Sequence, residues 1–222
     1  MKLKINIPLL LVLALISAGA ITLAFRLDEP VREFLVAAQG KDWKKSTEKK
    51  VYSAIRIWGD WPPLMGAAFV GFLVAKWRGN TKWRRIILAA MVASTLAGTL
   101  ANASRLTTGR TRPRESPKIA QGFYGPWHNG KSLIGNSAYN SFPSGHTATA
   151  FGFAAVIVLS SPAWGALALI GATAVAWSSI AMGAHHPSDV TVSVVLSFLV
   201  AWLVWRWFEG RRMLSESAPS GN

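Results

Sequence analysis

The chain has 222 residues, of which 51% are hydrophobic and only 15% charged, and its mean hydropathy is +0.29, which indicates a membrane protein with a single membrane-embedded domain over residues 1–222. A formal net charge of +14 does not indicate a nucleic-acid partner, because the basic residues gather at the ends of apolar segments. The absence of cysteine excludes disulfides, thiolate metal sites and a cysteine nucleophile.

Apolar segments recur along the whole chain. Six can be drawn, at approximately 7–25, 61–76, 86–104, 147–161, 163–182 and 190–208. Most reach or approach the ~20 residues that cross a bilayer as a helix. The sequence therefore predicts an all-α polytopic membrane protein, a bundle of about six transmembrane helices. The first segment contains Ala18-Gly19-Ala20, so a retained helix and a cleaved signal peptide are both compatible with it.

Two regions outside the apolar segments have a different character. Within the stretch 26–60, apolar residues from Val31 to Ala38 have helical spacing and residues 41–50 are strongly basic. This pattern favours interfacial helices within 30–57 beside anionic headgroups, with a solvated loop as the alternative. The polar tail over 213–222 is predicted to be disordered.

Charge in the short connections predicts the orientation of the bundle. Basic residues follow the second and the last apolar segments: Lys76, Arg78, Lys82, Arg84 and Arg85, then Arg206, Arg211 and Arg212. Such residues mark the cytoplasmic side, although the basic stretch 26–60 argues against this orientation. The connections 105–146 and 183–189 then share the outer face. A short chain with small loops indicates a bacterial inner membrane protein whose site faces the periplasm or exterior.

The first of three polar motifs is Arg105-x6-Arg112-Pro113. Gly109 and the restriction on the residue before Pro113 predict that the helix frays before Arg112. Both guanidinium groups can still converge on one phosphate, whose oxygens they bind bidentately while keeping their charge. The alternative is a basic flank of the third helix.

The second motif, Pro143-Ser144-Gly145-His146, precedes the fourth apolar segment. Ser144 suits a helix start, Gly145 lets a ligand approach the backbone, and the free N–H groups of a helix start bind anions. His146 is a candidate proton donor to a leaving alcohol, because its pKa is ordinarily near neutral. The alternative is a serine cap beside an interfacial histidine.

The third motif places His185 four residues before Asp189. A carboxylate reaching back from the first turn of the last helix fixes the tautomer of His185 and leaves the other ring nitrogen as a nucleophile. The alternative is an aspartate that only interacts with the helix dipole. His186 and His128 have no such partner. The histidines and carboxylates do not match a recognised metal-ligand spacing, so a route without metal or cofactor, through phosphohistidine, fits better.

These motifs resemble those of the type 2 phosphatidic acid phosphatase family, K-x6-R-P, P-S-G-H and S-R-x5-H-x3-D. The resemblance implies a membrane lipid phosphate or diphosphate as substrate, the lipid bilayer as surroundings, and no required metal. It also implies a role for each matching position. His185 is the expected nucleophile, Asp189 its orienting partner and His146 the general acid, while Arg105, Arg112, Ser144 and Gly145 bind the phosphate.

One position departs from the family pattern. Ser179 stands where the third motif has arginine, so a phosphate-binding charge is missing, and Arg110, Arg114 or Lys118 are candidates to replace it. The leading hypothesis is a lipid phosphatase. A lipid-to-lipid phosphotransferase and a degenerate lipid-phosphate-binding protein are the alternatives. The sequence leaves phosphatidylglycerol phosphate, phosphatidic acid, a lipid A phosphate and undecaprenyl diphosphate open as substrates.

Overall fold

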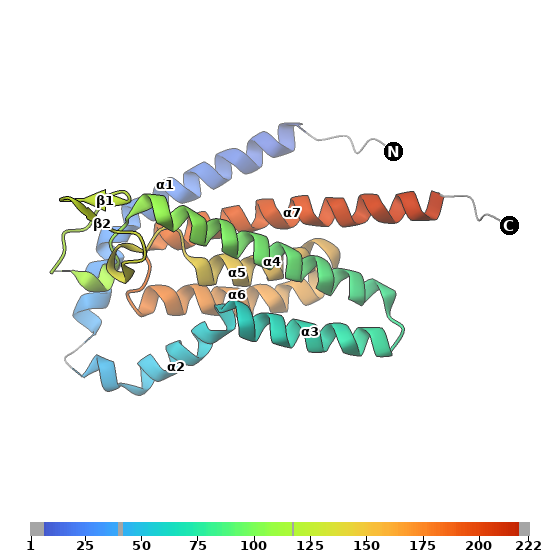
Figure 1. Ribbon diagram of the computed structural model, residues 1–222, viewed down its shortest axis with the longest axis horizontal. Helices are drawn as coiled ribbons and strands as arrows, with labels where there is room; N and C mark the ends of the chain where they lie inside the picture. The colour runs from blue at the N-terminus through green and yellow to red at the C-terminus, as the bar shows by residue number, and fades with distance from the viewer. Residues whose placement is uncertain (1–6, 40–41, 117, 218–222) are drawn as a thin grey trace.

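The computed structural model describes residues 7–39, 42–116 and 118–217 and is built almost entirely of helices (Figure 1). Its main helices are α1 (Ile7–Ala38), α2 (Thr47–Arg56), α3 (Trp61–Trp77), α4 (Thr81–Thr108), α5 (Gly145–Ser160), α6 (Pro162–Ala181) and α7 (Pro187–Ser217). The α4–α5 connection carries a small antiparallel hairpin, β1 (Trp127–His128) and β2 (Lys131–Ser132). Short 3-10 helices are Trp43–Lys45, Ile57–Gly59, Pro113–Glu115 and Ser137–Tyr139. The predicted all-α bundle is confirmed.

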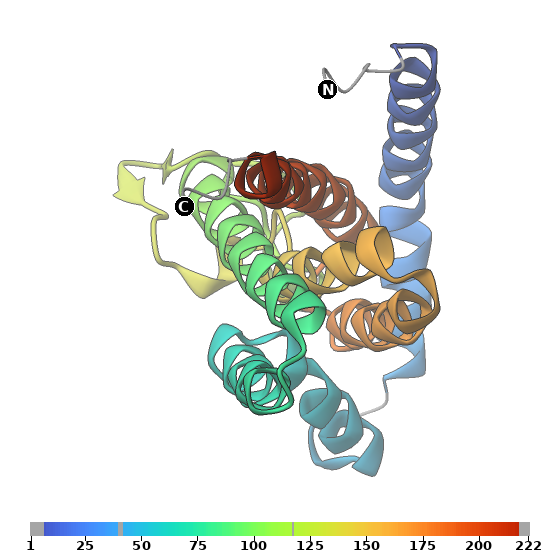
Figure 2. The ribbon, with the colours of Figure 1, turned by 90° about the vertical axis from the view of Figure 1, so that its right-hand side faces the viewer.

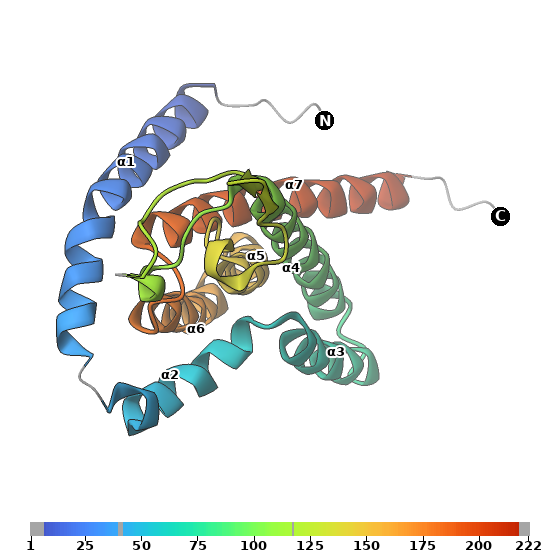
Figure 3. The same ribbon diagram turned by 60° about the vertical axis from the view of Figure 1, so that its left-hand side comes forward.

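Helix α5 forms the centre of the bundle, packed against α4, α6 and α7 (Figure 3). Ten of its sixteen residues are buried. Small residues allow the helices to approach closely. At Gly152, a Cβ atom would lie 3.0 Å from the carbonyl oxygen of Ala93 on α4. This packing places α5 directly against α4, and the second motif lies at the N-terminal end of α5.

Four helices are long and apolar enough to cross a membrane, at 7–38, 81–108, 162–181 and 187–210. Residues 47–59 and 61–77 form a pair bent by 60°, which makes a fifth span if the pair is counted as one. The chain is thus an integral membrane protein. Helix α5 is shorter, with 16 residues, but each of the six predicted apolar segments overlaps one helix of the bundle.

The first helix is longer than the sequence predicts. It continues from residue 25 through Pro30 to Ala38, so residues 30–38 belong to α1, and the short 3-10 helix Trp43–Lys45 and α2 follow it within 30–57. Hydropathy misses the extension because Arg26, Asp28 and Glu29 end the apolar run. The N-terminal half of α1 stands away from the bundle, whereas its later part approaches the other helices (Figure 2). There Asp28 is buried, with 8% exposed.

The loops that carry the motifs lie together at one end of the molecule. The hairpin and the α6–α7 turn are at this end, and the α3–α4 turn and the C-terminal end of α7 lie toward the other (Figure 1). This agrees with the shared face predicted for the two connections. At the far end α7 continues through residues 213–217, where the sequence predicts disorder. Met213 and Leu214 favour helix there, and the rest of that tail lies outside the described residues.

Candidate active site

His185 lies in the turn between α6 and α7 and is 1% exposed. Its Nδ1 atom is 2.7 Å from the carbonyl oxygen of Ser141, which can only accept a hydrogen bond. The proton is therefore on Nδ1, and Nε2 carries a free lone pair. Within the described part of the chain, the buried Nε2 atom has no hydrogen-bond partner.

Asp189 supports this arrangement from the first turn of α7, where it is fully buried. Its Oδ2 atom lies 3.7 Å from Nδ1 of His185, close enough for charge attraction but too far for a hydrogen bond. Oδ2 instead accepts from the Ser141 hydroxyl at 2.5 Å and the His186 backbone N–H at 2.8 Å. The expected Asp189–His185 partnership is thus mediated by Ser141, a residue that the motifs do not include.

Burial keeps His185 neutral. Desolvation lowers the pKa of His185 to about 3, and the positive charges of Arg105 and Arg112 act in the same direction, while Asp189 opposes them. Above this value the imidazole has no second proton. The lone pair on Nε2 is therefore available throughout the physiological pH range.

Arg105 and Arg112 lie within electrostatic range of His185 and come from different local structures. Arg105 is in the last turn of α4, which ends at Gly109 in a left-handed conformation, and Arg112 follows in extended backbone, as the sequence predicts. Arg105 Nε donates to the carbonyl of Pro143 at 2.8 Å, and Arg112 Nη2 to that of Asn140 at 3.2 Å. Among the residues that the structure describes, Arg105 Nη2 and Arg112 Nε are buried without a partner.

The second motif forms the start of α5. Ser144 is its N-cap and accepts a hydrogen bond from the backbone N–H of Thr147. A Cβ atom on Gly145 would lie 2.7 Å from Asn102 Oδ1 and 3.0 Å from Arg105 Nη2. Because Gly145 has no side chain, the guanidinium of Arg105 can lie beside the N-terminus of α5. The N-terminus of a helix is a favourable place for an anion to bind.

His146 is held between two residues that precede α3. Its Nε2 atom is 2.6 Å from Oδ1 of Asp60, and its Nδ1 atom is 3.4 Å from Nη2 of Arg56. Since the side chain of Asp60 is 49% exposed, it links the imidazole to water. Both His146 and His185 lie within electrostatic range of Arg105 and Arg112. The three motifs thus meet in one place, and residues 56–60 join them.

Arg110 is the centre of a buried ionic network beside the site. Its guanidinium contacts Asp189 Oδ1 and Asp28 Oδ2, each at 2.5 Å. Asp28 also accepts from the backbone N–H of Ser188 at 2.9 Å and from its hydroxyl at 2.6 Å, so α1 caps the start of α7. Three rings surround the guanidinium, those of Phe25, Phe123 and Phe142.

None of the three cations expected to replace the arginine at position 179 lies free in the site. Arg110 is neutralised by two carboxylates, Arg114 contacts Glu115 at 3.3 Å, and Lys118 is exposed. Ser179 is fully buried and its hydroxyl donates to the Val175 carbonyl within α6. Across residues 7–39, 42–116 and 118–217, no group of three histidine or acidic side chains is placed to hold a metal ion.

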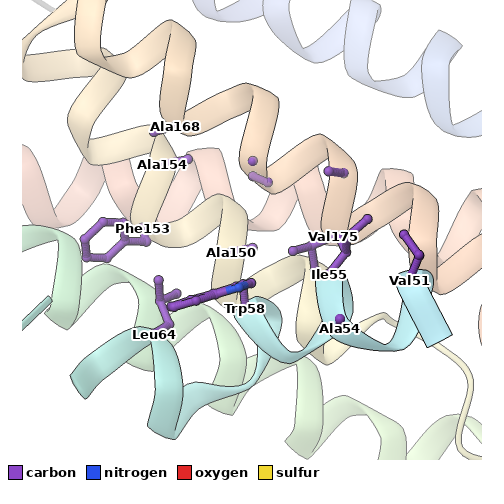
Figure 4. A pocket seen from close by; sticks show the side chains of 13 residues that line it. Val51, Ala54, Ile55, Trp58, Leu64, Ala150, Phe153, Ala154, Ala168 and Val175 are labelled. Atoms are coloured by element: carbon purple, nitrogen blue, oxygen red, sulfur yellow. The ribbon is translucent and has the colours of Figure 1, made fainter. Parts of the chain in front are cut away.

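An apolar cavity of about 570 Å³ lies between α2, α5 and α6 (Figure 4). Trp58, Phe153 and Val175 are among the side chains that line it. Val175 connects the cavity to the site, because a Cβ atom on Gly59 would lie 2.5 Å from Val175 Cγ1 and 2.8 Å from His146 Cβ. The cavity therefore adjoins the residues that hold His146.

The family model of the PAP2 superfamily matches residues 85–213, more than half of the chain and all three motifs. The chain belongs to the PAP2 superfamily. A lipid A 1-phosphatase of Rhizobium johnstonii is 30% identical over 125 residues, which are 56% of this chain and 49% of that protein. An undecaprenyl-diphosphatase of Bacillus subtilis is 30% identical over 141 residues, which are 63% of this chain and 67% of that protein.

Solved structures share the fold. The PAP2-type phosphatidylglycerolphosphate phosphatase of Bacillus subtilis superposes with a TM-score of 0.55 at 21% identity, covering 90% of this chain and 94% of that one. The structure of Aquifex aeolicus LpxE superposes with a TM-score of 0.54 at 20% identity, covering 81% of this chain and 95% of that one. This chain aligns with only about half the length of the lipid A 1-phosphatase from Rhizobium johnstonii.

Proposed function

We propose that this PAP2 protein is a lipid phosphatase that removes phosphate from a membrane lipid phosphomonoester or diphosphate through a phosphohistidine on His185. The observation that carries the proposal is the state of Nε2 of His185, which is buried and unprotonated and has no partner among the described residues. Arg105 and Arg112 lie nearby with unpartnered N–H groups directed to buried space. Arg105 and Arg112 form no ion pair with a carboxylate among the described residues, so their charges can bind the phosphate oxygens while Nε2 attacks phosphorus.

In the first step Nε2 of His185 attacks phosphorus, and the bond from phosphorus to the leaving oxygen breaks. His146 enters this step protonated, with its charge stabilised by Asp60 2.6 Å away. It gives a proton to that oxygen and becomes neutral, so the lipid leaves as a neutral alcohol or as a monophosphate. The imidazole of His185 becomes positively charged as the N–P bond forms. The Ser141 carbonyl keeps its hydrogen bond from Nδ1, and the charge of Asp189, 3.7 Å away, stabilises the cation.

In the second step water attacks the phosphohistidine and the N–P bond breaks. His146, now neutral, takes a proton from the water, which returns both histidines to their starting states and releases inorganic phosphate. Asp60, half exposed and in contact with His146, lets this imidazole exchange protons with solvent. The proposed route assigns every bond and proton change of both steps to these residues and water, and it therefore includes no metal ion.

The names of the relatives and the apolar cavity support a lipid substrate. Lipid A 1-phosphate and undecaprenyl diphosphate are the substrate classes that the relatives' names indicate. A volume of about 570 Å³ is within the range of ligand-binding pockets, and an apolar wall beside His146 suits a hydrocarbon chain of the substrate. The positive-inside distribution supports a site on the outer face of a bacterial inner membrane.

The experiment that tests this function measures phosphate release by detergent-purified protein with EDTA present. The panel comprises lipid A 1-phosphate, undecaprenyl diphosphate, phosphatidylglycerol phosphate and phosphatidic acid. We expect release from at least one of them at a rate that EDTA does not change. Loss of activity with EDTA would contradict the metal-free route, and saturable binding without release would favour a lipid-phosphate-binding protein.

The cavity gives a prediction about the lipid chain. Gly171 lines the cavity, and a Cβ atom added there would meet no atom within 4 Å, so Gly171→Phe is the substitution chosen to occupy this space. We expect KM to rise about tenfold for a long-chain substrate, equivalent to about 1.4 kcal/mol, and to change little for a short-chain, water-soluble analogue. Gly19→Phe is the matched control, because it is also open and α1 does not line the cavity. Equal KM values for the long-chain substrate in both variants would contradict this placement.

A further inference from the structure

Building on the proposed phosphatase function, we infer that Arg56 is the third phosphate-binding guanidinium of this site and replaces the arginine that the third motif lacks at Ser179. Arg56 ends α2 and lies outside residues 85–213, which carry the family match. Arg56 is in α2, whereas Ser179, which stands at the position of the family arginine, is in α6. The site is therefore completed by a segment that the family motifs do not include.

The packing of α2 on α6 places Arg56 along the part of α6 that carries Ser179. One turn before Arg56, the hydroxyl of Ser53 is 3.9 Å from the sulfur of Met182. Three residues after Arg56, Gly59 packs so closely on Val175 that a Cβ atom on Gly59 would lie 2.5 Å from Val175 Cγ1. Ser179 lies between these two contact points on α6, as Arg56 does on the opposing segment.

Small residues make this approach possible. Ser178 and Ser179 are fully buried, and both hydroxyls donate to the carbonyl of Val175 within their own helix. Gly59 has no room for a Cβ atom against Val175 and His146. A serine at position 179 and a glycine at position 59 therefore leave the space for Arg56 to enter beside α5 and α6.

The charge of Arg56 acts at the same place as the two motif arginines. Its Nη2 atom is 3.4 Å from Nδ1 of His146. The pKa of Arg112 is lowered to about 10, first by burial and then by the positive charges of Arg114, Arg105 and Arg56. Mutual repulsion among guanidinium groups costs free energy unless an anion joins them.

Arg56 also has hydrogen-bonding capacity that the protein does not use. Its Nε atom is buried without a partner, as are Nη2 of Arg105 and Nε of Arg112, among the residues described. Within the same residues, none of these three guanidinium groups forms an ion pair with a carboxylate, unlike Arg110. Three guanidinium groups with unused donors, and with no ion pair among the described residues, match the three oxygens of a phosphoryl group.

The test compares Arg56→Gln, Arg56→Lys and the double variant Arg56→Gln with Ser179→Arg. An arginine on a transferring phosphoryl group is worth about 10³-fold or more in rate, so we expect Arg56→Gln to lose about that factor in kcat/KM. Arg56→Lys keeps the charge and should lose less. The double variant restores the family pattern and should regain at least about tenfold over Arg56→Gln. Lys50→Gln, exposed on the same helix, is the matched control for loss of one positive charge.

A binding measurement separates this inference from the proposed function. Orthovanadate should stabilise the wild-type protein against thermal unfolding, and Arg56→Gln should weaken vanadate binding while the Tm without vanadate stays the same. If the wild-type protein binds vanadate but hydrolyses no lipid in the panel, the proposed phosphatase function is contradicted. The vanadate affinity of Arg56→Gln then still tests whether Arg56 binds the anion. The assignment of Arg56 would be overturned if Arg56→Gln lowered kcat/KM by less than about threefold, or if it left the affinity for vanadate unchanged.

Discussion

Replacement of His185 by alanine is expected to abolish phosphate release. Loss of the nucleophile in a covalent mechanism costs about 10⁴-fold to 10⁶-fold in kcat, because the remaining groups still bind the substrate but cannot form the intermediate. Vanadate binding should persist in His185→Ala, because Arg105, Arg112 and the start of α5 are unchanged. The measurement is steady-state phosphate release together with vanadate-dependent thermal stabilisation.

His128 provides the matched control for this variant. It lies on the hairpin, half-buried, with its ring centroid 4.6 Å from that of Tyr124. The hydrogen bonds described for Arg105, Arg112, His146 and His185 do not involve His128. His128→Ala should keep activity within about twofold, as surface substitutions away from special features usually have small effects. Full activity in His185→Ala would remove that residue from the mechanism.

The second large effect is expected on stability, at Arg110. Arg110→Met leaves the carboxylates of Asp28 and Asp189 buried without their common cation. Removing one partner of a buried ionic cluster destabilises a protein by about 3 to 5 kcal/mol. We therefore expect a large fall in Tm in detergent. Activity should fall as well, since Asp189 supports Ser141 and His185.

Two variants test the reason for that loss. Arg110→Lys keeps a positive charge, but an ammonium group lacks the planar set of N–H donors with which a guanidinium binds two carboxylates. Its Tm should therefore lie between those of the wild type and Arg110→Met. Arg206→Met removes an arginine that packs over Trp202 at 4.7 Å and has no carboxylate partner in the described chain; it should change the Tm little. Equal Tm values for Arg110→Met and Arg206→Met would contradict the structural role of the network.

The membrane helices and the motif residues could be predicted from the sequence because their signals are local. Hydropathy locates the apolar parts of α1 and of α3 to α7, and the residues around His146 and His185 are short motifs within a few positions of a helix start. The position of Gly109 and the proline after Arg112 also predicted where α4 ends. These features depend on backbone conformation and on neighbours close in sequence.

The rest of the site depends on contacts between distant parts of the chain. Asp28 caps α7 from 160 residues away, and Arg56 reaches His146 from 90 residues away. Asp28 also appears in the sequence as the polar end of an apolar run, which is why the first helix was predicted to end too early. Ser141 carries no motif, and its carbonyl becomes important only when the α6–α7 turn folds beside it.

The stereochemical course at phosphorus tests most directly whether the phosphoryl group passes through His185. A hydrolysed lipid substrate from the panel would be prepared with a phosphoryl group made chiral by oxygen isotopes and sulfur, and the configuration of the released thiophosphate would be determined. Two successive in-line displacements, on His185 and then by water, predict net retention of configuration. Net inversion would mean that water attacks the lipid phosphate directly and would contradict the phosphohistidine route.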